Sequence, residues 1–559
     1  MTTKYIFISG GVISGVGKGI TTASVSLLLK SCGLKVAPIK ADPYINLDAG
    51  TMNPVVHGET FVTEDGLETD QDLGHYERFL NENLTRLNYM TLGQVFQSVI
   101  QRERSMGYGG KCVELVPHIP EEIIQRLENL KSNAKAEVVI FEIGGTSGEY
   151  QNLVFLEAAR ELKFNNPQDV LNIHVAYLPL PPSLGELKSK PVQASVRFLN
   201  SAGIQPDIII GRAPRPIDEA RREKIATFCG VKKEDVFSSH DAHSIYEVPE
   251  ILDSQGLTRR ILTKLGLGMT EPKLKTWHDF VAKIGQAKRG IKIAIVGKYF
   301  RSGDFSLEDS YICVIEAVKQ ACWWQGLQPK ITWIDSLDVE RKGTRILEGF
   351  SGIIIPQGWG SRGVEGKIAT AGFARVNKIP YLGLCFGMQM AVIEFARNVC
   401  HLKDANTEEV DPKTPHPVIH IMPNQKEYLA KHQYGGTIRL GAWPCKLVKG
   451  TKTRECYRRH AEFISASKTI LNQVQDDDWF ISERHRHRYE LNNKYREVLA
   501  KNGMVVSGVS PDGNLVEAIE LTDHPFFIGT QYHPELKSRP LSPHPLFLEF
   551  IKACCQIKK

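Results

Sequence analysis

The stretch from Tyr5 to Thr22, YIFISGGVISGVGKGITT, constrains the fold of this chain more than any other segment. It opens with four residues, Tyr5 to Ile8, that are typical of a buried strand in a parallel sheet. A glycine-rich turn follows, and a helical pattern of apolar residues then continues until Gly33 ends it. A strand, a glycine turn and a helix in this order predict an α/β fold with a phosphate site at the turn.

The turn matches a standard phosphate-binding loop only in part. The pattern GxxxxGK[ST] has four residues between its glycines, whereas five separate Gly11 from Gly17, and a glycine instead of a hydroxyl residue follows Lys18. A purely structural glycine turn is therefore the alternative. We exclude a secretory signal because glycines and Lys18 interrupt the apolar run and no small-residue cleavage site follows.

Composition limits the class of protein. With 559 residues the chain is too long for a single core, so we expect several domains. Its net charge of +6 is too small to indicate nucleic-acid binding, and no run of about 18 apolar residues predicts a membrane span. Eleven cysteines without a CxxC pair indicate neither a disulfide framework nor a zinc site. We therefore expect a soluble, cytoplasmic protein that binds neither nucleic acid nor membranes.

A second strand carries Lys40 and leads towards an acidic loop. Carboxylate oxygens suit Mg²⁺, and substrate phosphates commonly complete its coordination, so an acidic loop beside a phosphate site indicates this ion. A solvated acidic loop without a metal is the alternative. The acidic residues are Glu59, Glu64, Asp65, Glu68, Asp70 and Asp72.

The second half of the chain begins with a new strand. Residues 267–290 are polar and basic, and the apolar segment IKIAIVGK then starts at Ile291. Helical periodicity and a further apolar strand, Ile353 to Ile355, follow in alternation. We predict two α/β domains, residues 1–266 and 291–559, each with a mostly parallel sheet, joined by a linker at 267–290.

A candidate nucleophile lies in the second domain. In IPYLGLCFGMQM the strand Tyr381 to Leu384 meets Cys385 and a helix follows, which is the outline of a nucleophile elbow. A helix N-terminus favours the thiolate form of such a cysteine. A buried structural cysteine is the alternative, but QYHPE supplies His533 as a base and Glu535 to orient it. We expect these two side chains to face the same way on an extended segment.

Three long segments near the N-terminus resemble the amidoligase domain of CTP synthases. They are GGVISGVGKGITTAS, KADPYINLDAGTMNP and HGETFVTEDGLETDQDLGHYERF, in this order and nearly without gaps. The likeness continues through VPHIP, FEIGGTSGEYQ, GELKSKPVQASV and EKIATFCGV, and with the second half it covers essentially the whole chain. It implies a P-loop or Rossmann-like synthetase domain.

This resemblance implies roles for residues of the first domain. Lys18 and Lys40 would lie near the transferred phosphoryl group, and Asp72 and Glu142 would hold Mg²⁺. Without the resemblance, the lysines would be read as solvated surface residues. The implied ATP site consists of Gly15, Val16, Gly17, Lys18, Gly19, Ile20, Asp72, Arg212 and Asp241. The implied UTP or CTP site consists of Ser14, Glu149, Tyr150, Gln151, Lys188, Ser189, Lys190, Pro191, Val192, Gln193 and Lys224.

The segments GLCFGMQ and QYHPE resemble the class I glutamine amidotransferase domain. The resemblance implies that Cys385 attacks the side-chain amide of glutamine, that His533 transfers protons and that Glu535 orients this histidine. The backbone N–H of Phe386 would stabilise the oxyanion. The basic run ERHRHRYE is an alternative sign of nucleic-acid binding, but it lacks interleaved aromatic residues. The implied glutamine site consists of Gly358, Phe386, Gln389, Glu409 and Arg488.

The sequence departs from the family pattern at several places. Glu149 and Gln151 replace an Asp and a Glu, and Lys111 follows an altered Tyr-Gly-Gly turn; both changes bear on regulatory binding. Gln357 occupies a position that is usually glycine, and it would cost about 1–3 kcal/mol of strain if the backbone there needs a positive φ. An apparent insertion at residues 461–478 is predicted to be a surface loop.

Together the resemblances imply a carbon–nitrogen ligase with two chemistries. The first domain would phosphorylate O4 of UTP with ATP, and ammonia released from glutamine in the second domain would displace the phosphate. The family further implies a homotetramer, activation by GTP and inhibition by CTP. Two alternatives stay open, namely amination of another nucleotide, such as a purine nucleotide, and a non-catalytic nucleotide-binding or filament-forming paralogue.

Overall fold

The computed structural model describes residues 2–11, 13–302, 305–306, 308–423, 425–431, 435–461 and 479–556. The chain forms two compact units, and both are α/β, as the sequence predicts. Unit 1 comprises Met1–Leu47, His75–Leu80 and Leu84–Val281, and unit 2 comprises Asp48–Gly74, Asn81–Asn83 and Ala282–Lys559. The domain limits at 266 and 291 stay a prediction.

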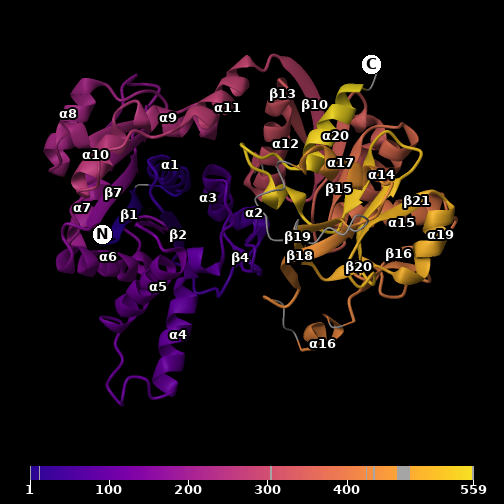
Figure 1. Cartoon of the computed structure of the whole chain (residues 1–559), viewed down its shortest axis with the longest axis horizontal. Coiled ribbons are helices and arrows are strands. Elements are labelled where there is room, and N and C mark those ends of the chain that lie inside the picture. The colour runs from indigo at the N-terminus through magenta and orange to yellow at the C-terminus, as the bar shows by residue number, and fades with distance from the viewer. Residues whose placement is uncertain are drawn as a thin grey trace. The chain divides into compact units, whose positions relative to one another are not determined.

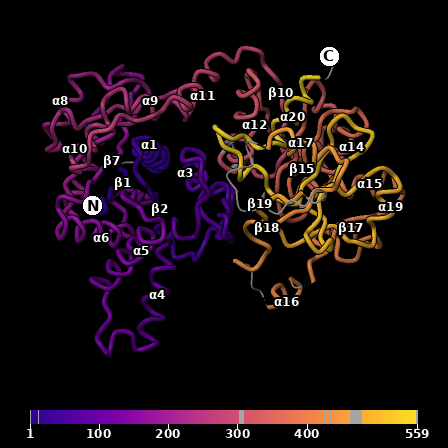
Figure 2. The backbone as a smooth tube through the Cα atoms, viewed as in Figure 1, coloured from indigo at the N-terminus to yellow at the C-terminus, as the bar shows by residue number. Residues whose placement is uncertain are grey.

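Unit 1 contains a parallel sheet of seven strands (Figure 1). Their spatial order is β5 (Tyr89–Thr91), β2 (Val36–Asp42), β6 (Val138–Ile143), β1 (Lys4–Gly11), β7 (Val170–Tyr177), β8 (Ile208–Ala213) and β9 (Val236–His240). The helices lying wholly in unit 1 include α1 (Lys18–Ser31), α4 (Leu92–Arg104), α5 (His118–Ala134), α6 (Leu153–Asn165), α7 (Lys190–Ser201), α8 (Glu219–Cys229), α9 (Val248–Asp253) and α10 (Leu257–Lys264). Figure 2 shows α4 and the connection to α5 protruding from this unit.

Side chains of β1 alternate between the two faces of the sheet, as the strand period requires. Tyr5 and Phe7 share a core cluster with residues of α5 and α6, whereas Ile6 and Ile8 share another with residues of α1 and α10. Helices therefore cover both faces. This burial on both sides explains why β1 is a continuous apolar run.

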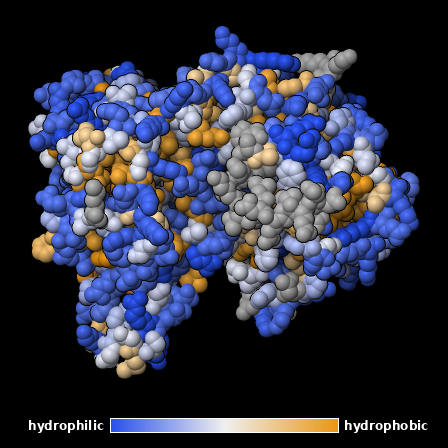
Figure 3. Space-filling model, viewed as in Figure 1, coloured by the Kyte–Doolittle hydropathy of each residue, from blue (hydrophilic) through white to orange (hydrophobic). Residues whose placement is uncertain are grey.

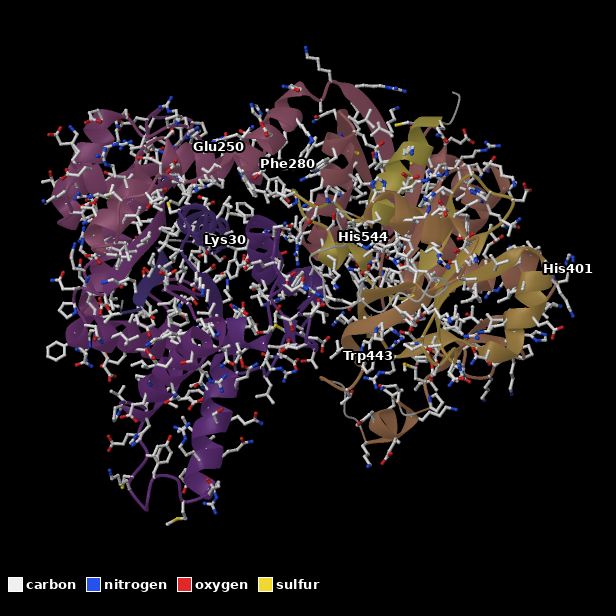
Figure 4. All side chains as sticks on the ribbon, in the orientation of Figure 1. Lys30, Glu250, Phe280, His401, Trp443 and His544 are labelled. Atoms are coloured by element: carbon white, nitrogen blue, oxygen red, sulfur yellow. The ribbon has the colours of Figure 1, made fainter. Side chains whose placement is uncertain are left out.

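The predicted linker contains a helix, α11 (Lys275–Gln286). Trp277 and Phe280, the latter labelled in Figure 4, are buried on one side of it. The indole N–H of Trp277 donates to the Tyr246 carbonyl at 2.9 Å, and both rings pack near the ring of Tyr246. The first part of this segment is thus anchored to unit 1.

Unit 2 contains a mixed sheet of nine strands. Their order is β13 (Leu327–Asp335), β10 (Arg289–Gly297), β14 (Gly352–Ile355), β15 (Tyr381–Leu384), β23 (Phe527–Thr530), β22 (Val516–Leu521), β21 (Met504–Val509), β18 (Arg439–Leu447) and β19 (Trp479–His487). The pairings are parallel from β13 to β23 and antiparallel beyond β23. The predicted parallel arrangement holds for the part that carries Cys385, and the antiparallel extension was not anticipated.

Two core clusters lie on the faces of this sheet. Adjacent residues of β10, such as Ile293 and Ala294, belong to different clusters. One cluster includes residues of α12 (Ile312–Trp324) and α20 (Pro545–Gln556), and the other includes residues of α14 (Val364–Val376) and α15 (Phe386–Asn398). The helices of unit 2 include α2 (Pro54–His57), α12 (Ile312–Trp324), α13 (Ser336–Lys342), α14 (Val364–Val376), α15 (Phe386–Asn398), α16 (Gln425–Ala430), α17 (Lys452–Arg459), α19 (Arg496–Lys501) and α20 (Pro545–Gln556). Its minor strands are β11 (Arg301–Ser302), β12 (Phe305–Ser306), β16 (Asn406–Thr407), β17 (Pro417–Ile421) and β20 (Tyr489–Leu491).

An acidic hairpin, β3 (Phe61–Val62) and β4 (Glu68–Thr69), belongs to unit 2 although it lies early in the sequence. Arg484 of β19 is fully buried and donates to the Val62 carbonyl at 3.0 Å and to Glu64 at 2.9 Å. Arg486 donates to Glu68 at 2.7 Å. Part of the acidic loop is therefore paired with the basic run of β19.

Most of the apparent insertion, residues 462–478, lies outside the described residues. Figure 3 shows a face on which hydrophilic residues predominate and hydrophobic ones form scattered groups. In the part of the chain that the structure describes, no helix is long and apolar enough to cross a membrane.

Candidate active site

Cys385 lies at the corner between β15 and α15, where the sequence predicts it. Its φ of 49° and ψ of −98° are unusual for a residue with a side chain. Close packing requires glycine beside it, because a Cβ on Gly387 would lie 2.0 Å from the Ile355 carbonyl oxygen. The Cys385 N–H donates to the Thr530 carbonyl at 2.6 Å, which ties the corner to the end of β23.

His533 and Glu535 form a buried pair. Nδ1 of His533 lies 2.7 Å from Oε1 of Glu535, and the His533 N–H donates to the Arg484 carbonyl at 2.8 Å. The sequence predicts an extended segment here, and this prediction is wrong. Glu535 belongs to a 3₁₀ helix, Pro534–Lys537. The proline at its start allows this turn while the two side chains still meet.

The charges around His533 favour its protonated form. Burial by itself lowers the pKa of His533, but the negative charges of Glu535 and of a Cys385 thiolate outweigh this and raise the pKa to about 10. Nε2 of His533 has no other hydrogen-bond partner within the described residues, and both the charge of Cys385 and hydrogen bonding to it favour the protonated ring.

The predicted glutamine residues surround the same corner. Glu409 Oε1 accepts from the Gly360 N–H at 2.6 Å, and burial raises the pKa of this carboxyl despite the nearby Lys298 and Arg488. Arg488 donates to Gln425 at 3.1 Å. Gly358 is closely packed, since a Cβ there would lie 3.2 Å from Cδ of Lys298. Phe386 begins α15, whose first N–H groups have no partner within the helix.

Gln357 makes a specific contact instead of straining the backbone. It is not among the described non-glycine residues with positive φ, so the condition for strain is not met. Its Nε2 donates to Oε1 of Glu59 at 2.6 Å, and Oε2 of Glu59 accepts from the Cys313 N–H at 2.7 Å. Burial raises the pKa of Glu59 to about 7. Glu59, Gln357, Gly358 and His533 line one small pocket.

Sequence reasoning missed Lys298. Its Nζ donates to the carbonyls of Trp359 and Gly360 at 3.0 and 2.5 Å and lies 4.3 Å from the centre of the Phe386 ring. Burial lowers the pKa of Lys298 to about 8. A lysine directly after the apolar strand IKIAIVG was the available signal, because a charged residue there lies at the carboxyl edge of a parallel sheet.

In unit 1 the glycine turn leads into α1 as predicted. Gly15 and Gly17 have φ of 70° and 94°, and Gly17 is the residue before the helix. Lys18 is almost fully buried, and its Nζ donates to the Gly145 carbonyl at 2.6 Å. A side chain on Gly10 would collide with Lys18 at 2.6 Å, so this glycine gives the lysine its path across the turn. Val16 packs into the core beside α1.

Lys40 and Glu142 meet at the carboxyl ends of β2 and β6. The lysine Nζ lies 2.9 Å from Oε1 of Glu142, and the Tyr76 hydroxyl donates to Oε2. Each carboxylate oxygen keeps a further lone pair, so these contacts leave ligation of a cation possible. In unit 2, Asp72 is half-buried at the first position of α3 (Asp72–Leu80), and its N–H donates to Asp70 at 3.1 Å. Carboxylates of this kind suit Mg²⁺.

Arg212 lies in β8, and Asp241 and Glu149 follow the carboxyl ends of β9 and β6. Arg212 pairs with Asp241 at 2.5 Å, and Cδ of Arg212 lies 3.9 Å from a Cβ placed on Gly17. Glu149 accepts from the Thr146 N–H at 3.0 Å and from Gln151 at 3.0 Å.

The other nucleotide candidates differ in exposure. Ser189 precedes α7 and Pro191 lies in its first turn, while the Gln193 amide donates to the Ser189 hydroxyl at 3.1 Å. Val192 is buried, whereas Tyr150 and Lys224 are exposed. The roles of all these residues stay predictions.

Comparisons with known proteins cover the whole chain. Residues 4–267 match the family model described as CTP synthase N-terminus, and residues 306–553 match the model for class-I glutamine amidotransferase. A protein from Caldanaerobacter subterraneus subsp. tengcongensis named CTP synthase is 49% identical over 557 residues, with 99% of each chain covered. Another of that name, from Carboxydothermus hydrogenoformans, is 51% identical over 559 residues, which is 100% of this chain and 99% of the relative. The solved glutaminase domain of Trypanosoma brucei CTPS with bound acivicin is 34% identical and covers 48% of this chain and 95% of its own, with a TM-score of 0.40.

Proposed function

The chain belongs to the CTP synthase family, a family of glutamine-hydrolysing ligases in pyrimidine biosynthesis, and on that premise we propose how its own residues perform the reaction. Unit 2 releases ammonia from glutamine. Unit 1 uses ATP to phosphorylate O4 of UTP, and ammonia then displaces the phosphate to give CTP. The observation that carries the proposal is the Cys385, His533 and Glu535 constellation at a strand-to-helix corner.

In the glutaminase step, the Cys385 thiolate attacks the side-chain carbonyl of glutamine. His533 donates a proton to the departing ammonia and then accepts one from the water that hydrolyses the thioester, while Glu535 holds its ring. The N–H groups of Phe386 and Gly358 stabilise the oxyanion. Glu409 and Arg488 bear opposite charges and bind the amino and carboxylate groups of glutamine, and Gln389 completes this glutamine site.

In the synthetase step, the turn from Gly15 to Ile20 binds ATP phosphates through its N–H groups and the N-terminus of α1. Lys18 exchanges the Gly145 carbonyl for a phosphate, and Lys40 counters charge on the transferred phosphoryl group. Arg212 and Asp241 bind the adenosine part of ATP. UTP, or CTP as inhibitor, contacts the residues around Glu149, Lys188 and Lys224.

The donor chemistry of Asp72 and Glu142 fits Mg²⁺, which would neutralise phosphate charge during the transfer when bound. We further propose that the enzyme is a cytoplasmic homotetramer, activated by GTP and inhibited by CTP. The family resemblance supports these properties, and gel filtration with and without nucleotides measures the assembly.

The test is CTP formation from ATP and UTP with glutamine or with ammonium as nitrogen donor. We expect CTP from both donors in the wild type, and we expect Cys385→Ala to make CTP from ammonium only, because no thioester forms. Wild-type CTP formation from glutamine by Cys385→Ala, with free ammonium removed, would refute the glutaminase assignment. Binding of both nucleotides without turnover would identify a non-catalytic paralogue, and amination of a purine nucleotide instead of UTP would identify another acceptor.

A further inference from the structure

Gln531 has no role in the glutaminase step described above, although it lies next to Sγ of Cys385. Strands β15 and β23 are parallel, with Leu384 paired to Thr530. The next residue on each strand is Cys385 and Gln531, so the sheet register brings these two together at its carboxyl edge. The Gln531 side chain is fully buried, and its Nε2 lies 3.4 Å from Sγ of Cys385.

A chain of oriented amides determines which end of Gln531 faces the sulfur. A backbone carbonyl only accepts hydrogen bonds, so the Tyr489 carbonyl, at 2.9 Å, must receive the NH₂ group of Gln389. The same NH₂ group donates to Oε1 of Gln531 at 3.3 Å. The amide oxygen of Gln531 is thereby held by Gln389, which leaves its NH₂ group for the sulfur.

The sulfur also lies near a hydrogen-bond acceptor. The Arg486 carbonyl oxygen lies 3.7 Å from Sγ of Cys385, at a distance where it accepts a hydrogen bond from a neutral thiol. A carbonyl oxygen repels a thiolate, whereas an amide N–H attracts it. Of these two neighbours, only Gln531 offers a donor that stabilises a thiolate, and it does so beside the basic groups His533 and Lys367, which also interact with Cys385.

We propose that Gln531 is a further catalytic residue of the glutaminase centre and that its side-chain amide donates a hydrogen bond to the Cys385 thiolate. Gln389 acts as a positioning residue that holds this amide in the donating orientation. The hydrogen bond lowers the free energy of the thiolate before attack, and again when the sulfur leaves the thioester. This proposal rests on the glutaminase chemistry assigned to Cys385.

Gln531→Leu tests the proposal in the full chain. Hydrogen bonds to charged groups contribute about 1.5–3 kcal/mol, so we expect at least a tenfold lower thiolate population near neutral pH. The measurement is the pH dependence of Cys385 alkylation by iodoacetamide, followed by mass spectrometry of the peptide that contains Cys385. We expect the alkylation midpoint to rise by about one pH unit or more, and kcat for glutamine to fall while its KM changes little.

The matched control is Gln320→Leu. Gln320 is equally buried on α12, and its Oε1 accepts from the Ser538 hydroxyl at 2.8 Å. We expect this variant to keep the wild-type alkylation midpoint. Gln389→Leu provides a second test if Gln531→Leu fails to fold by circular dichroism, because freeing the Gln531 amide to rotate should raise the midpoint by a smaller amount.

The outcomes separate this proposal from the glutaminase assignment itself. An unchanged alkylation midpoint in folded Gln531→Leu, even with a lower melting temperature, would overturn the role of Gln531 and reduce it to core packing. An unchanged midpoint in Gln389→Leu would remove the positioning role. Failure of the glutaminase assignment would appear differently, as normal CTP formation from glutamine after alkylation of Cys385 is complete.

Discussion

Replacing Glu535 by glutamine removes the charge that holds His533 protonated. In the native protein the pKa of His533 is about 10, against an ordinary 6.5, and its Nδ1 lies 2.7 Å from the Glu535 carboxylate. The substituted glutamine would offer hydrogen-bonding atoms but no charge, so the pKa of His533 would fall and a smaller fraction of the histidine would be protonated. The Cys385 thiolate would then have a weaker cationic neighbour.

We expect Glu535→Gln to lower the glutaminase kcat by about 10²–10⁴-fold, the range for losing a working general acid and base. The assay is glutamate release with ATP and UTP present, measured from pH 6 to 10. The basic limb of the pH profile should move to lower pH, since the proton leaves His533 earlier. A wild-type kcat with an unmoved basic limb would refute the reasoning.

The same pair predicts how stability depends on pH. The pKa of His533 is higher in the folded than in the unfolded chain, so its stabilising contribution is complete below about pH 6.5 and is lost as the pH rises towards 10. Glu535→Gln should flatten this part of the melting-temperature profile. Glu483→Gln is the matched control, because Glu483 pairs at 3.0 Å with the buried His544, which is labelled in Figure 4, and also accepts from Tyr457.

Three further predictions concern other residues. Asp72→Asn should abolish CTP formation from either nitrogen donor while glutamate release persists, and synthesis from ammonium at the wild-type rate would remove Asp72 from the metal site. Gln357→Gly should not raise glutamine-dependent turnover, because its backbone is unstrained, but should lower the melting temperature by removing a hydrogen bond to Glu59; faster turnover would show that glycine is needed there. Deleting residues 461–478 should leave ammonium-dependent synthesis unchanged, and loss of this activity in a folded deletion protein would give the segment a structural role.

The sequence predicts those parts of the fold that are encoded locally. The strand Tyr381–Leu384 has the predicted bounds because a short apolar run ends at Cys385, and the turn before α1 follows from its glycines. The triad residues could be named because each lies in a compact motif. Their approach across about 150 residues of chain could not be derived from spacing alone.

Contacts between distant segments were beyond such reasoning. The basic run of β19 and the acidic loop near Glu64 look like separate binding features in the sequence. In the structure, Arg484 and Arg486 lie two residues apart on the strand and pair with Glu64 and Glu68. The local sequence around a buried charge does not show which distant residue will pair with it. Gln531 was missed for a similar reason, since only the register of β15 and β23 brings it to Cys385.

The placement of the acidic hairpin determines which segments can be exchanged between this enzyme and its relatives to make hybrid proteins. A hybrid made by joining the first 290 residues of one enzyme to the remainder of another would pair one parent's hairpin with the other parent's β19. The buried Arg484 would then depend on a foreign Glu64 and Val62 carbonyl. Gly66 would lie against the other parent's residue 441, and any side chain in place of Gly441 would bring its Cβ to 2.7 Å from the Gly66 nitrogen. A workable exchange must therefore transfer residues 48–74 together with the C-terminal half.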